Sequence, residues 1–247
     1  MIVGKLLFRY GHPVMFFCTL FKMAQLDLIV TEDGSHTLYN PELKEHYHST
    51  HGAIQEGMHI FINAGLREVV KKKKQVRILE VGFGTGLNCM LTMLEGWRTG
   101  LEIDYHAVEP FPLSEKLLCT LNYAGLLDIQ DNPCDFELIH TENEGEIELG
   151  SEFRLIKYKQ PIQQFNPLPG FFDLVYFDAF APNVQPSIWT GAVFKQMHDC
   201  LTPGGILVTY CAQGQVRRNM KEAGFLIEKL PGPPGKREMT RAIAGAI

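Results

Sequence analysis

Three glycines that follow an apolar stretch form the part of the chain most suited to chemistry. They lie in the run Ile78-Leu79-Glu80-Val81-Gly82-Phe83-Gly84-Thr85-Gly86-Leu87-Asn88. A buried strand, a turn in which glycines let the backbone approach a ligand, and a helix are expected there. The spacing is G-x-G-x-G rather than the G-x-G-x-x-G that places a pyrophosphate on a helix N-terminus. Glu80, directly before the turn, favours a ligand that carries positive charge and no phosphate.

Two acidic residues that follow later strands complete the expected site. Glu109 lies about 20 residues beyond the glycines, where an acid can accept hydrogen bonds from ribose hydroxyls. Asp178 follows the strand pattern at 174–177, and open α/β sheets bind ligands at the carboxyl ends of their strands. Asp173, at the entrance of that strand, is assigned to structure. The pattern predicts a methyltransferase with Asp178 as catalytic residue and S-adenosylmethionine bound by Glu80, Gly82, Phe83, Gly84, Thr85, Gly86, Asn88, Glu109 and Asp178.

From Val76 onward, strand and helix patterns alternate, which is typical of a mainly parallel sheet covered on both faces. Strands are expected at 76–81, 103–108, 153–158, 174–177, 205–211, 225–230 and 241–246. The short final strand follows a long excursion and predicts an antiparallel edge. The expected fold is therefore α/β and Rossmann-like, with a mainly parallel seven-stranded sheet that has an antiparallel edge.

The part before Val76 is expected to form a smaller N-terminal unit over 23–75, ahead of a methyltransferase domain at 76–247. Asp33-Gly34 between the apolar runs 26–30 and 36–39 predicts a β-hairpin. Apolar residues at helical spacing within 47–65 predict a helix that ends at the lysines 71–74. Residues 1–22 are an extension of uncertain status, interpreted as a start-site artefact ahead of Met23.

Composition limits the class of protein. The 247 residues carry 45% hydrophobic side chains, a formal net charge of −5 and six cysteines without a C-x-x-C pair. Neither a zinc site nor a disulfide framework is indicated, so a cytoplasmic setting is expected. The apolar run at 14–21 is too short to span a bilayer, and no membrane association is expected. The acidic balance confines any nucleic-acid contact to a local basic patch.

Several motifs together resemble the methyltransferase domain of the MnmC family, over the chain from about Tyr39 to its end. The motifs are Gly82 to Asn88, Asp178-Ala179-Phe180-Ala181-Pro182 with Trp189, Pro203-Gly204-Gly205, and Lys236-Arg237-Glu238-Met239. The resemblance implies a class I S-adenosylmethionine-dependent methyltransferase that methylates the aminomethyl group of the tRNA wobble uridine, giving 5-methylaminomethyl-2-thiouridine. It places the three glycines and Glu109 on cofactor-binding positions and Asp178 beside the amine. The family domain is often fused to a flavin-dependent oxidase, which is expected here as a separate partner of a standalone domain.

Departures from the family pattern concern the adenine and the substrate loop. The acidic Gly-Asp pair that commonly ends the third strand is replaced by Lys157-Tyr158-Lys159-Gln160-Pro161, so Gln160 or backbone groups are expected to meet the adenine. The approach to Lys236 is the proline-rich run 231–235, which should be stiffer because proline fixes φ. Four histidines, His46, His48, His51 and His59, are interpreted as exposed or substrate-side groups, because their irregular spacing lacks the partners of a zinc site.

The expected reaction is an in-line methyl transfer to an amine nitrogen, without metal or covalent intermediate. A carboxylate with an ordinary pKa near 4 is a poor proton acceptor from ammonium, so Asp178 should orient the amine while the proton leaves to water. The predicted substrate-binding residues are Lys236, Arg237, Arg217 and Arg218, with Lys229, Arg241 and the four lysines as further candidates for RNA contact.

Two other functions fit parts of the pattern. A methyl- or aminopropyltransferase acting on a small amine could use the same cofactor pocket, but it would not need a basic rim. A noncatalytic tRNA-binding partner of a separate oxidase would not need the glycine turn, Glu109 and Asp178.

Overall fold

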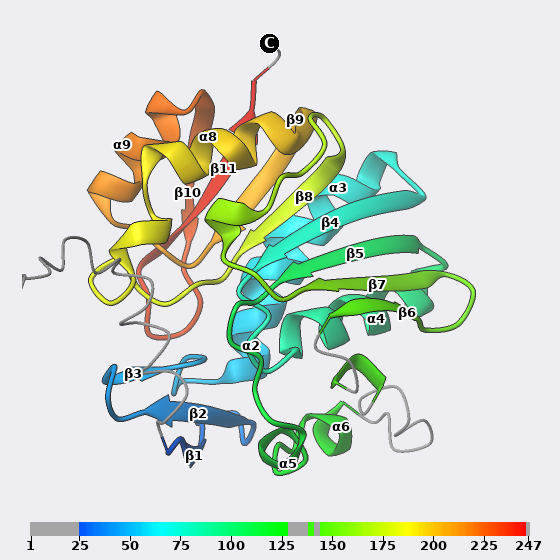
Figure 1. Ribbon diagram of the computed structural model, residues 1–247, viewed down its shortest axis with the longest axis vertical. Coiled ribbons are helices and arrows are strands. Elements are labelled where there is room, and N and C mark those ends of the chain that lie inside the picture. Colours follow the sequence, from blue (N-terminus) through cyan, green and yellow to red (C-terminus); the bar gives the residue numbers. More distant parts are fainter. Residues whose placement is uncertain (1–24, 128–137, 141–143, 246–247) are drawn as a thin grey trace, which may run out of the picture.

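A twisted sheet of eight strands, in the order β10-β11-β9-β8-β4-β5-β7-β6, forms the centre of the computed structural model (Figure 1). The structure describes residues 25–127, 138–140 and 144–245, so the predicted extension at 1–22 and Met23 lie outside the described residues. The strands are β4 (Gln75–Val81), β5 (Glu102–Val108), β6 (Gly145–Glu148), β7 (Phe153–Tyr158), β8 (Phe172–Phe177), β9 (Leu201–Thr209), β10 (Phe225–Pro231) and β11 (Glu238–Ala244). The strands β7, β5, β4, β8 and β9 pair in parallel, which confirms the mainly parallel α/β fold.

Two details of the sheet differ from the expectation. The described sheet has an eighth strand, β6, whose sequence Gly-Glu-Ile-Glu buries only Ile147 and therefore lacks the apolar run of an interior strand. The final strand starts at Glu238 and lies between β9 and β10, antiparallel to both, rather than at an edge. Both edge strands pair antiparallel, β10 with β11 and β6 with β7. Strand β11 lies beside β9 because the chain turns back after β10 in a hairpin, which places β11 between the two strands.

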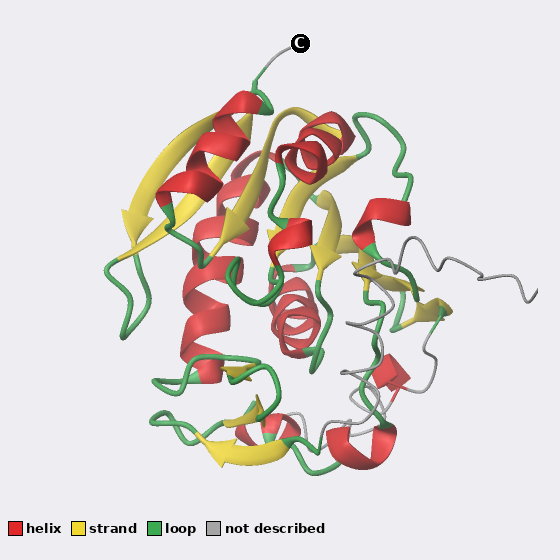
Figure 2. Ribbon diagram, turned by 60° about the vertical axis from the view of Figure 1, so that its left-hand side comes forward, coloured by secondary structure: helices red, strands yellow, loops and turns green. Residues whose placement is uncertain are grey.

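Helices cover both faces of the sheet (Figure 2). On one face lie α4 (Leu87–Thr99) and a continuous helical stretch made of α2 (Ala53–Gly57), the π-helix η1 (Met58–Leu66), α3 (Arg67–Val69) and the 3-10 turn η2 (Val70–Lys72). Their apolar side chains form one buried core with alternate residues of the strands, such as Ile78 and Tyr176. On the other face α8 (Gly191–Cys200) and α9 (Gly214–Glu222) pack on the intervening residues, such as Leu79 and Phe177. The helix expected to end at the lysines does end there.

The predicted hairpin is present and belongs to a small separate sheet. Strands β1 (Asp27–Val30) and β2 (His36–Asn40) pair antiparallel around the Asp33-Gly34 turn, and β3 (Glu45–His46) adds to β2. The sheet is held to the short helices α5 (Glu115–Leu118) and α6 (Tyr123–Leu126), because the Tyr123 hydroxyl donates to the carbonyl of His36 at 2.7 Å. The segment that follows, from Glu45 to α2, therefore passes the carboxyl ends of the main strands.

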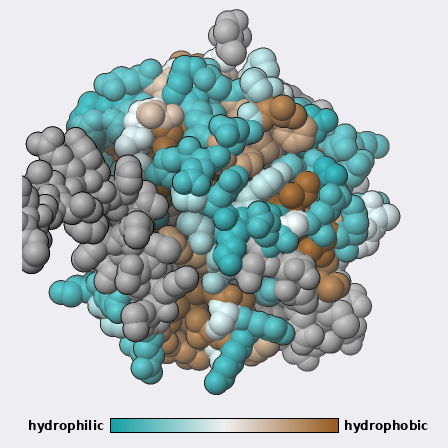
Figure 3. Space-filling model, in the orientation of Figure 1, coloured by the Kyte–Doolittle hydropathy of each residue, from teal (hydrophilic) through white to brown (hydrophobic). Residues whose placement is uncertain are grey.

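The surface is mostly hydrophilic in Figure 3, with a hydrophobic patch at the lower edge over the small N-terminal sheet and α5. Leu28 and Val30 of β1 are among the exposed large hydrophobic residues, at 42% and 65% exposure. Among the helices of the described residues, none combines the length and apolar composition needed to cross a membrane.

Candidate cofactor and amine site

A cavity of about 580 Å³ opens at the carboxyl ends of the parallel strands, within the range of small-molecule sites. Its walls come from segments far apart in the sequence, because the strands end side by side at one edge of the sheet. The lining residues used below are Gly82, Phe83, Gly84, Glu109, Asp178, Tyr47, His48, Glu56, Tyr210 and Lys236. The predicted glycine turn, ribose ligand and catalytic acid therefore line the same cavity.

The glycine turn approaches the next strand so closely that a side chain would not fit. Gly82 has φ +92°, and a Cβ built on it would lie 2.4 Å from the carbonyl oxygen of Asp178. Gly86 has φ +74° and precedes the first residue of α4, where a Cβ would lie 2.7 Å from the ring of His140. L-residues avoid such φ values. Gly82 and Gly84 line the cavity, whereas Gly86 starts the helix and does not line it.

Glu109 binds the glycine turn and still faces the cavity. Its Oε2 accepts a hydrogen bond from the amide of Gly84 at 3.2 Å, and its Oε1 accepts one from the amide of Phe111 at 2.8 Å. Burial raises the pKa of Glu109, although these amide hydrogen bonds oppose the effect. Each carboxylate oxygen can accept more than one hydrogen bond, so Glu109 can also meet ribose hydroxyls.

Four of the predicted cofactor residues lie beneath the turn and do not line the cavity. Asn88 is buried and its Nδ2 donates to Glu80 Oε1 at 2.9 Å and to Asp178 Oδ2 at 2.8 Å. Burial raises the pKa of Glu80 well above its ordinary value. Thr85 Oγ1 lies 2.7 Å from His48 Nε2. These four residues, Glu80, Thr85, Gly86 and Asn88, support the turn. Because Glu80 does not line the cavity, its carboxyl group does not contact a ligand there.

Asp178 is held at the end of β8 by main-chain and side-chain contacts. Its amide donates to the carbonyl of Val81 at 2.9 Å, and its Oδ2 accepts from Asn88. Burial raises the pKa of Asp178 to about 7, and the negative charge of Glu56 adds to the shift, while Asn88 and Lys236 oppose it. From the sequence, an ordinary pKa near 4 is expected for this carboxyl group. The structure corrects that premise, because a carboxylate with a pKa near 7 is a better proton acceptor.

Lys236, predicted to contact RNA, points into the cavity instead. Its Nζ donates to Glu56 Oε1 at 2.6 Å and lies 4.1 Å from the centre of the Tyr210 ring. The amide of Ser49 donates to Glu56 Oε2 at 2.8 Å, so both oxygens of this acid are fixed. Glu56 matches the family pattern but was given no specific role from the sequence, and Tyr210 was not predicted to belong to the site. Tyr210 could have been found, because it follows β9 directly and the carboxyl ends of parallel strands carry the site.

The predicted basic surface is only partly available. Arg217 is buried at 8% exposure and donates to Thr240 Oγ1, Glu238 Oε2 and the carbonyl of Met239, so it fixes α9 to β11. Arg218 and Arg237 are exposed. The four lysines precede β4, at the opposite end of the strands from the cavity, and Lys73 forms an ion pair with Asp173. That ion pair agrees with the assignment of Asp173 to structure.

Neighbours of Gln160, rather than Gln160 itself, lie where the adenine contact was predicted, and two of the four histidines face the cavity. Pro161, Ile162 and Gln163 line the cavity after β7, whereas Gln160 does not. His46 and His48 line it as well, and burial lowers the pKa of His48 to about 4, which keeps this ring neutral at pH 7. Within residues 25–127, 138–140 and 144–245, no group of three or more His, Cys, Asp or Glu side chains could hold a metal ion.

Comparisons with known proteins agree on the class. Residues 142–244 match a family described as S-adenosyl-L-methionine-dependent methyltransferase. The tRNA 5-methylaminomethyl-2-thiouridine biosynthesis bifunctional protein MnmC of Cupriavidus metallidurans is 30% identical over 230 residues, covering 87% of this chain and 33% of the relative. The MnmC protein of Cupriavidus necator is 31% identical over 218 residues, covering 83% and 32%. The chain thus spans about a third of the length of these relatives.

A solved structure shares the fold. The crystal structure of MNMC2 from Aquifex aeolicus superposes with a TM-score of 0.70 at 24% sequence identity, and the match covers 96% of this chain and 79% of that one.

Proposed function

We propose that this chain is an MnmC-like, S-adenosylmethionine-dependent methyltransferase domain that methylates the aminomethyl group on the wobble uridine of tRNA in the cytoplasm. The product would be 5-methylaminomethyl-2-thiouridine. The observation that carries the proposal is the carboxyl group of Asp178, which shares a cavity with the glycine turn and Glu109 and whose pKa is raised to about 7. Such a group suits a substrate that arrives as an ammonium ion and must lose a proton.

The residues of the cavity fit the cofactor. Gly82 and Gly84 leave open the space that side chains would fill, and Glu109 offers carboxylate oxygens to hydroxyl donors. Val81, Val108, Ile162 and Ile188 give the cavity an apolar wall suited to a purine ring. When bound, S-adenosylmethionine supplies an electrophilic methyl group on a sulfonium. The glycine turn and Glu109 would hold it, and Asp178 would face the amine.

Asp178 would accept the proton that the amine must lose. An alkylammonium ion with a pKa of about 10.4 gives up its proton to an ordinary aspartate at a cost of roughly 9 kcal/mol. With the pKa of Asp178 at about 7, that cost falls to roughly 5 kcal/mol. Asn88 occupies Oδ2, and Oδ1 accepts no hydrogen bond from the described residues. Oδ1 would therefore take the proton of the ammonium group before the nitrogen attacks.

Positioning would supply the larger part of the rate enhancement. Holding two reactants in a near-attack arrangement is worth roughly 7–11 kcal/mol. The glycine turn, β5 and β8 are fixed in one sheet by parallel pairing, for example of Val81 with both Val108 and Phe177. Of the four predicted substrate-binding residues, Arg218 and Arg237 remain exposed. A separate flavin-dependent oxidase remains a proposed partner that acts on the same tRNA position.

The proposal is tested by incubating the purified protein with methyl-labelled S-adenosylmethionine and either undermethylated tRNA or free polyamines. Digestion of the tRNA and identification of the labelled nucleoside should give 5-methylaminomethyl-2-thiouridine. Label in polyamines alone would instead support a small-amine transferase, and label in neither would refute an amine methyltransferase. Untreated tRNA that already carries the methyl group is the matched control and should accept no label.

A further inference from the structure

A primary ammonium group is already bound inside the cavity, and it belongs to the protein. Lys236 Nζ donates to Glu56 Oε1 at 2.6 Å and stands over the Tyr210 ring at 4.1 Å. A carboxylate and an aromatic face are the two partners that bind cations in desolvated sites. Asp178 lines the same cavity as Glu56, Tyr210 and Lys236, so the bound ammonium and the proposed catalytic carboxyl group share one site.

The acid that holds this ammonium is rigid and almost fully buried. Glu56 is 7% exposed and lies on α2, directly before the π-helix η1. The amide of Ser49 fixes its second oxygen, so the carboxylate cannot turn away when its cation leaves. A buried carboxylate without a cation is costly, which means that Glu56 needs a cation in this position.

Lys236 reaches the cavity from a hairpin tip at the surface. The turn between β10 and β11 is closed by hydrogen bonds from Gly232 N to the carbonyl of Arg237 and from Lys236 N to the carbonyl of Pro233. His59 Nε2 lies 2.9 Å from the carbonyl of Pro231, which ties the tip to the π-helix. The lysine side chain has a flexible four-carbon stem. It can therefore leave the cavity without movement of the sheet.

We propose that Glu56 and Tyr210 form the binding subsite for the substrate's aminomethyl group, and that Lys236 is an internal occupant that the substrate must displace. The inference rests on the proposed function, because the substrate amine and the lysine end in the same CH2–NH3+ group. Exchange of one primary ammonium for another leaves Glu56 paired at every stage. Glu56 and Tyr210 then bind the cation, and Asp178 removes its proton, so binding and proton transfer fall to two different acids.

The subsite is tested with methylammonium chloride as the probe and Lys236→Met as the variant. Titration followed by calorimetry or NMR, with S-adenosylhomocysteine present, should show at least tenfold tighter methylammonium binding to Lys236→Met than to the unaltered protein. The double variant Lys236→Met, Glu56→Gln should lose that gain. Lys221→Met, which makes the same change at an exposed lysine outside the cavity, is the matched control and should bind methylammonium like the unaltered protein. Equal binding by Lys236→Met and the unaltered protein would overturn the proposal.

A second measurement needs no variant and covers the case in which Lys236→Met does not fold. Lysine labelling of the unaltered protein, read by mass spectrometry, should be slower at Lys236 than at the exposed Lys221. Addition of the free nucleoside 5-aminomethyl-2-thiouridine should accelerate labelling of Lys236 alone. No change at Lys236, at a concentration where the nucleoside binds, would contradict displacement. Methylation of tRNA by the unaltered protein is scored separately, so failure of the subsite is distinguishable from failure of the proposed function.

Discussion

Two aspartates of the same sheet, Asp178 and Asp104, have very different pKa values, although burial acts to raise the pKa of both. Asp178 lies at the carboxyl end of β8, and its pKa is raised to about 7. Asp104 lies on β5, and its pKa is lowered to about 2, although burial acts to raise it. The difference shows that the partners of an acid, and not its burial alone, decide its charge.

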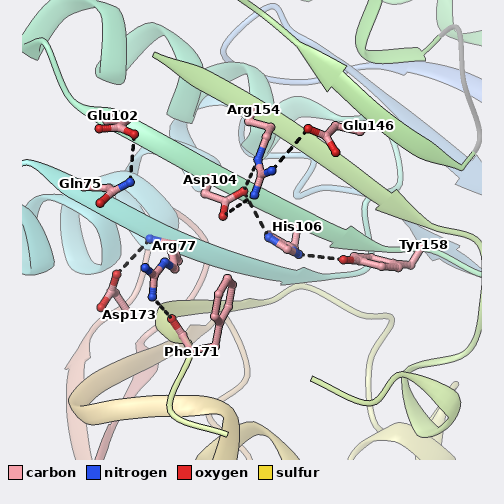
Figure 4. Close-up of polar contacts among 10 residues, drawn as sticks. All are labelled: Gln75, Arg77, Glu102, Asp104, His106, Glu146, Arg154, Tyr158, Phe171 and Asp173. Atoms are coloured by element: carbon pink, nitrogen blue, oxygen red, sulfur yellow. Dashed lines mark hydrogen bonds and ion pairs between the residues drawn. The ribbon is translucent and has the colours of Figure 1, made fainter. Parts of the chain in front are cut away.

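The partners of Asp104 are complementary in charge and geometry (Figure 4). Arg154 on β7 donates to both of its oxygens at 3.0 Å, and His106 Nε2 lies 3.2 Å from Oδ1. The His106 ring in turn lies 3.0 Å from the Tyr158 hydroxyl. A bidentate arginine is the strongest common partner of a carboxylate. Within the described residues, the Asp178 side chain accepts a hydrogen bond only from the neutral amide of Asn88, and the charges of Glu56 and Lys236 act on it in opposite senses.

The contrast separates a carboxylate that stabilises the fold from a carboxylate that we expect to take part in the reaction. Asp104 stays ionised because its charge is matched, so it stabilises the fold and has no proton to exchange near pH 7. Asp178 has no such ion pair among the described residues, and we expect its carboxyl group to exchange a proton with a cationic substrate. Perturbed carboxyl groups of this kind cluster at functional sites because the fold is not optimised around them.

The largest effect that would break this comparison is expected from Asp178→Asn. Loss of the proton acceptor should reduce the single-turnover methylation rate by about 10²–10⁴-fold, the usual range for general acid–base groups. Asp173→Asn is the matched control, because it makes the same change at the other end of β8 and removes the ion pair to Lys73. It should lower stability and keep the rate. A normal rate in Asp178→Asn would remove Asp178 from catalysis.

Asp178→Asn should also stabilise the protein against unfolding. A carboxyl group whose pKa rises from 3.8 to about 7 on folding holds its proton more tightly in the native state, so stability falls as pH rises through this window. The penalty above pH 7 is on the order of 4 kcal/mol as an upper bound. Denaturant unfolding at pH 8 should show Asp178→Asn to be more stable than the unaltered protein.

The gain should shrink towards pH 4, where the native and unfolded carboxyl groups are both protonated. A gain of the same size at both pH values would point to packing rather than ionisation as its cause.

Much of the site could be predicted from sequence because it depends on local pattern. The glycine turn, Glu109 and Asp178 each follow an apolar strand directly, and parallel strands bring their ends together. The pKa of Asp178 could not be predicted, since it depends on Asn88, Glu56 and Lys236, which tertiary folding brings together from three distant segments. The inward direction of Lys236 was missed for the same reason, because a lysine in a Gly/Pro-rich loop is ordinarily exposed.

In the sheet, too, some strands could be predicted from local sequence and others could not. Strands β4, β5 and β8 are buried on both faces, and their apolar runs predict them. Strand β6 contains two glutamates in its four residues and is held by pairing with β7, so no local signal distinguishes it from a loop. The place of β11 between β9 and β10 depends on a hairpin return, which neither strand's sequence specifies.

A smaller effect is expected from Asp104→Asn, which tests the matched side of the comparison. The lowered pKa of Asp104 gives stability that is present above pH 4 and lost as pH falls towards 2, by the reverse of the argument for Asp178. Allowing for solvent screening of the partly exposed Arg154, the loss at pH 7 should be about 1–2 kcal/mol. Urea unfolding measures it, and kcat/KM for tRNA should stay unchanged. A change in kcat/KM without a stability loss would mean that this cluster serves the reaction.

The smallest effect extends the comparison from acids to cations, through the adjacent Arg217 and Arg218. Arg217 is matched by Glu238 and buried, whereas Arg218 is exposed and donates only to Gln215 among the described residues. Arg218→Gln should keep stability and weaken tRNA binding, with the log–log slope of affinity against salt reduced by about one unit, as for one lost phosphate contact. Arg217→Gln should instead lower stability, because its three partners on β11 lose their donor. An unchanged salt slope in Arg218→Gln would place the RNA path elsewhere on the rim, with Arg237 as the next residue to change.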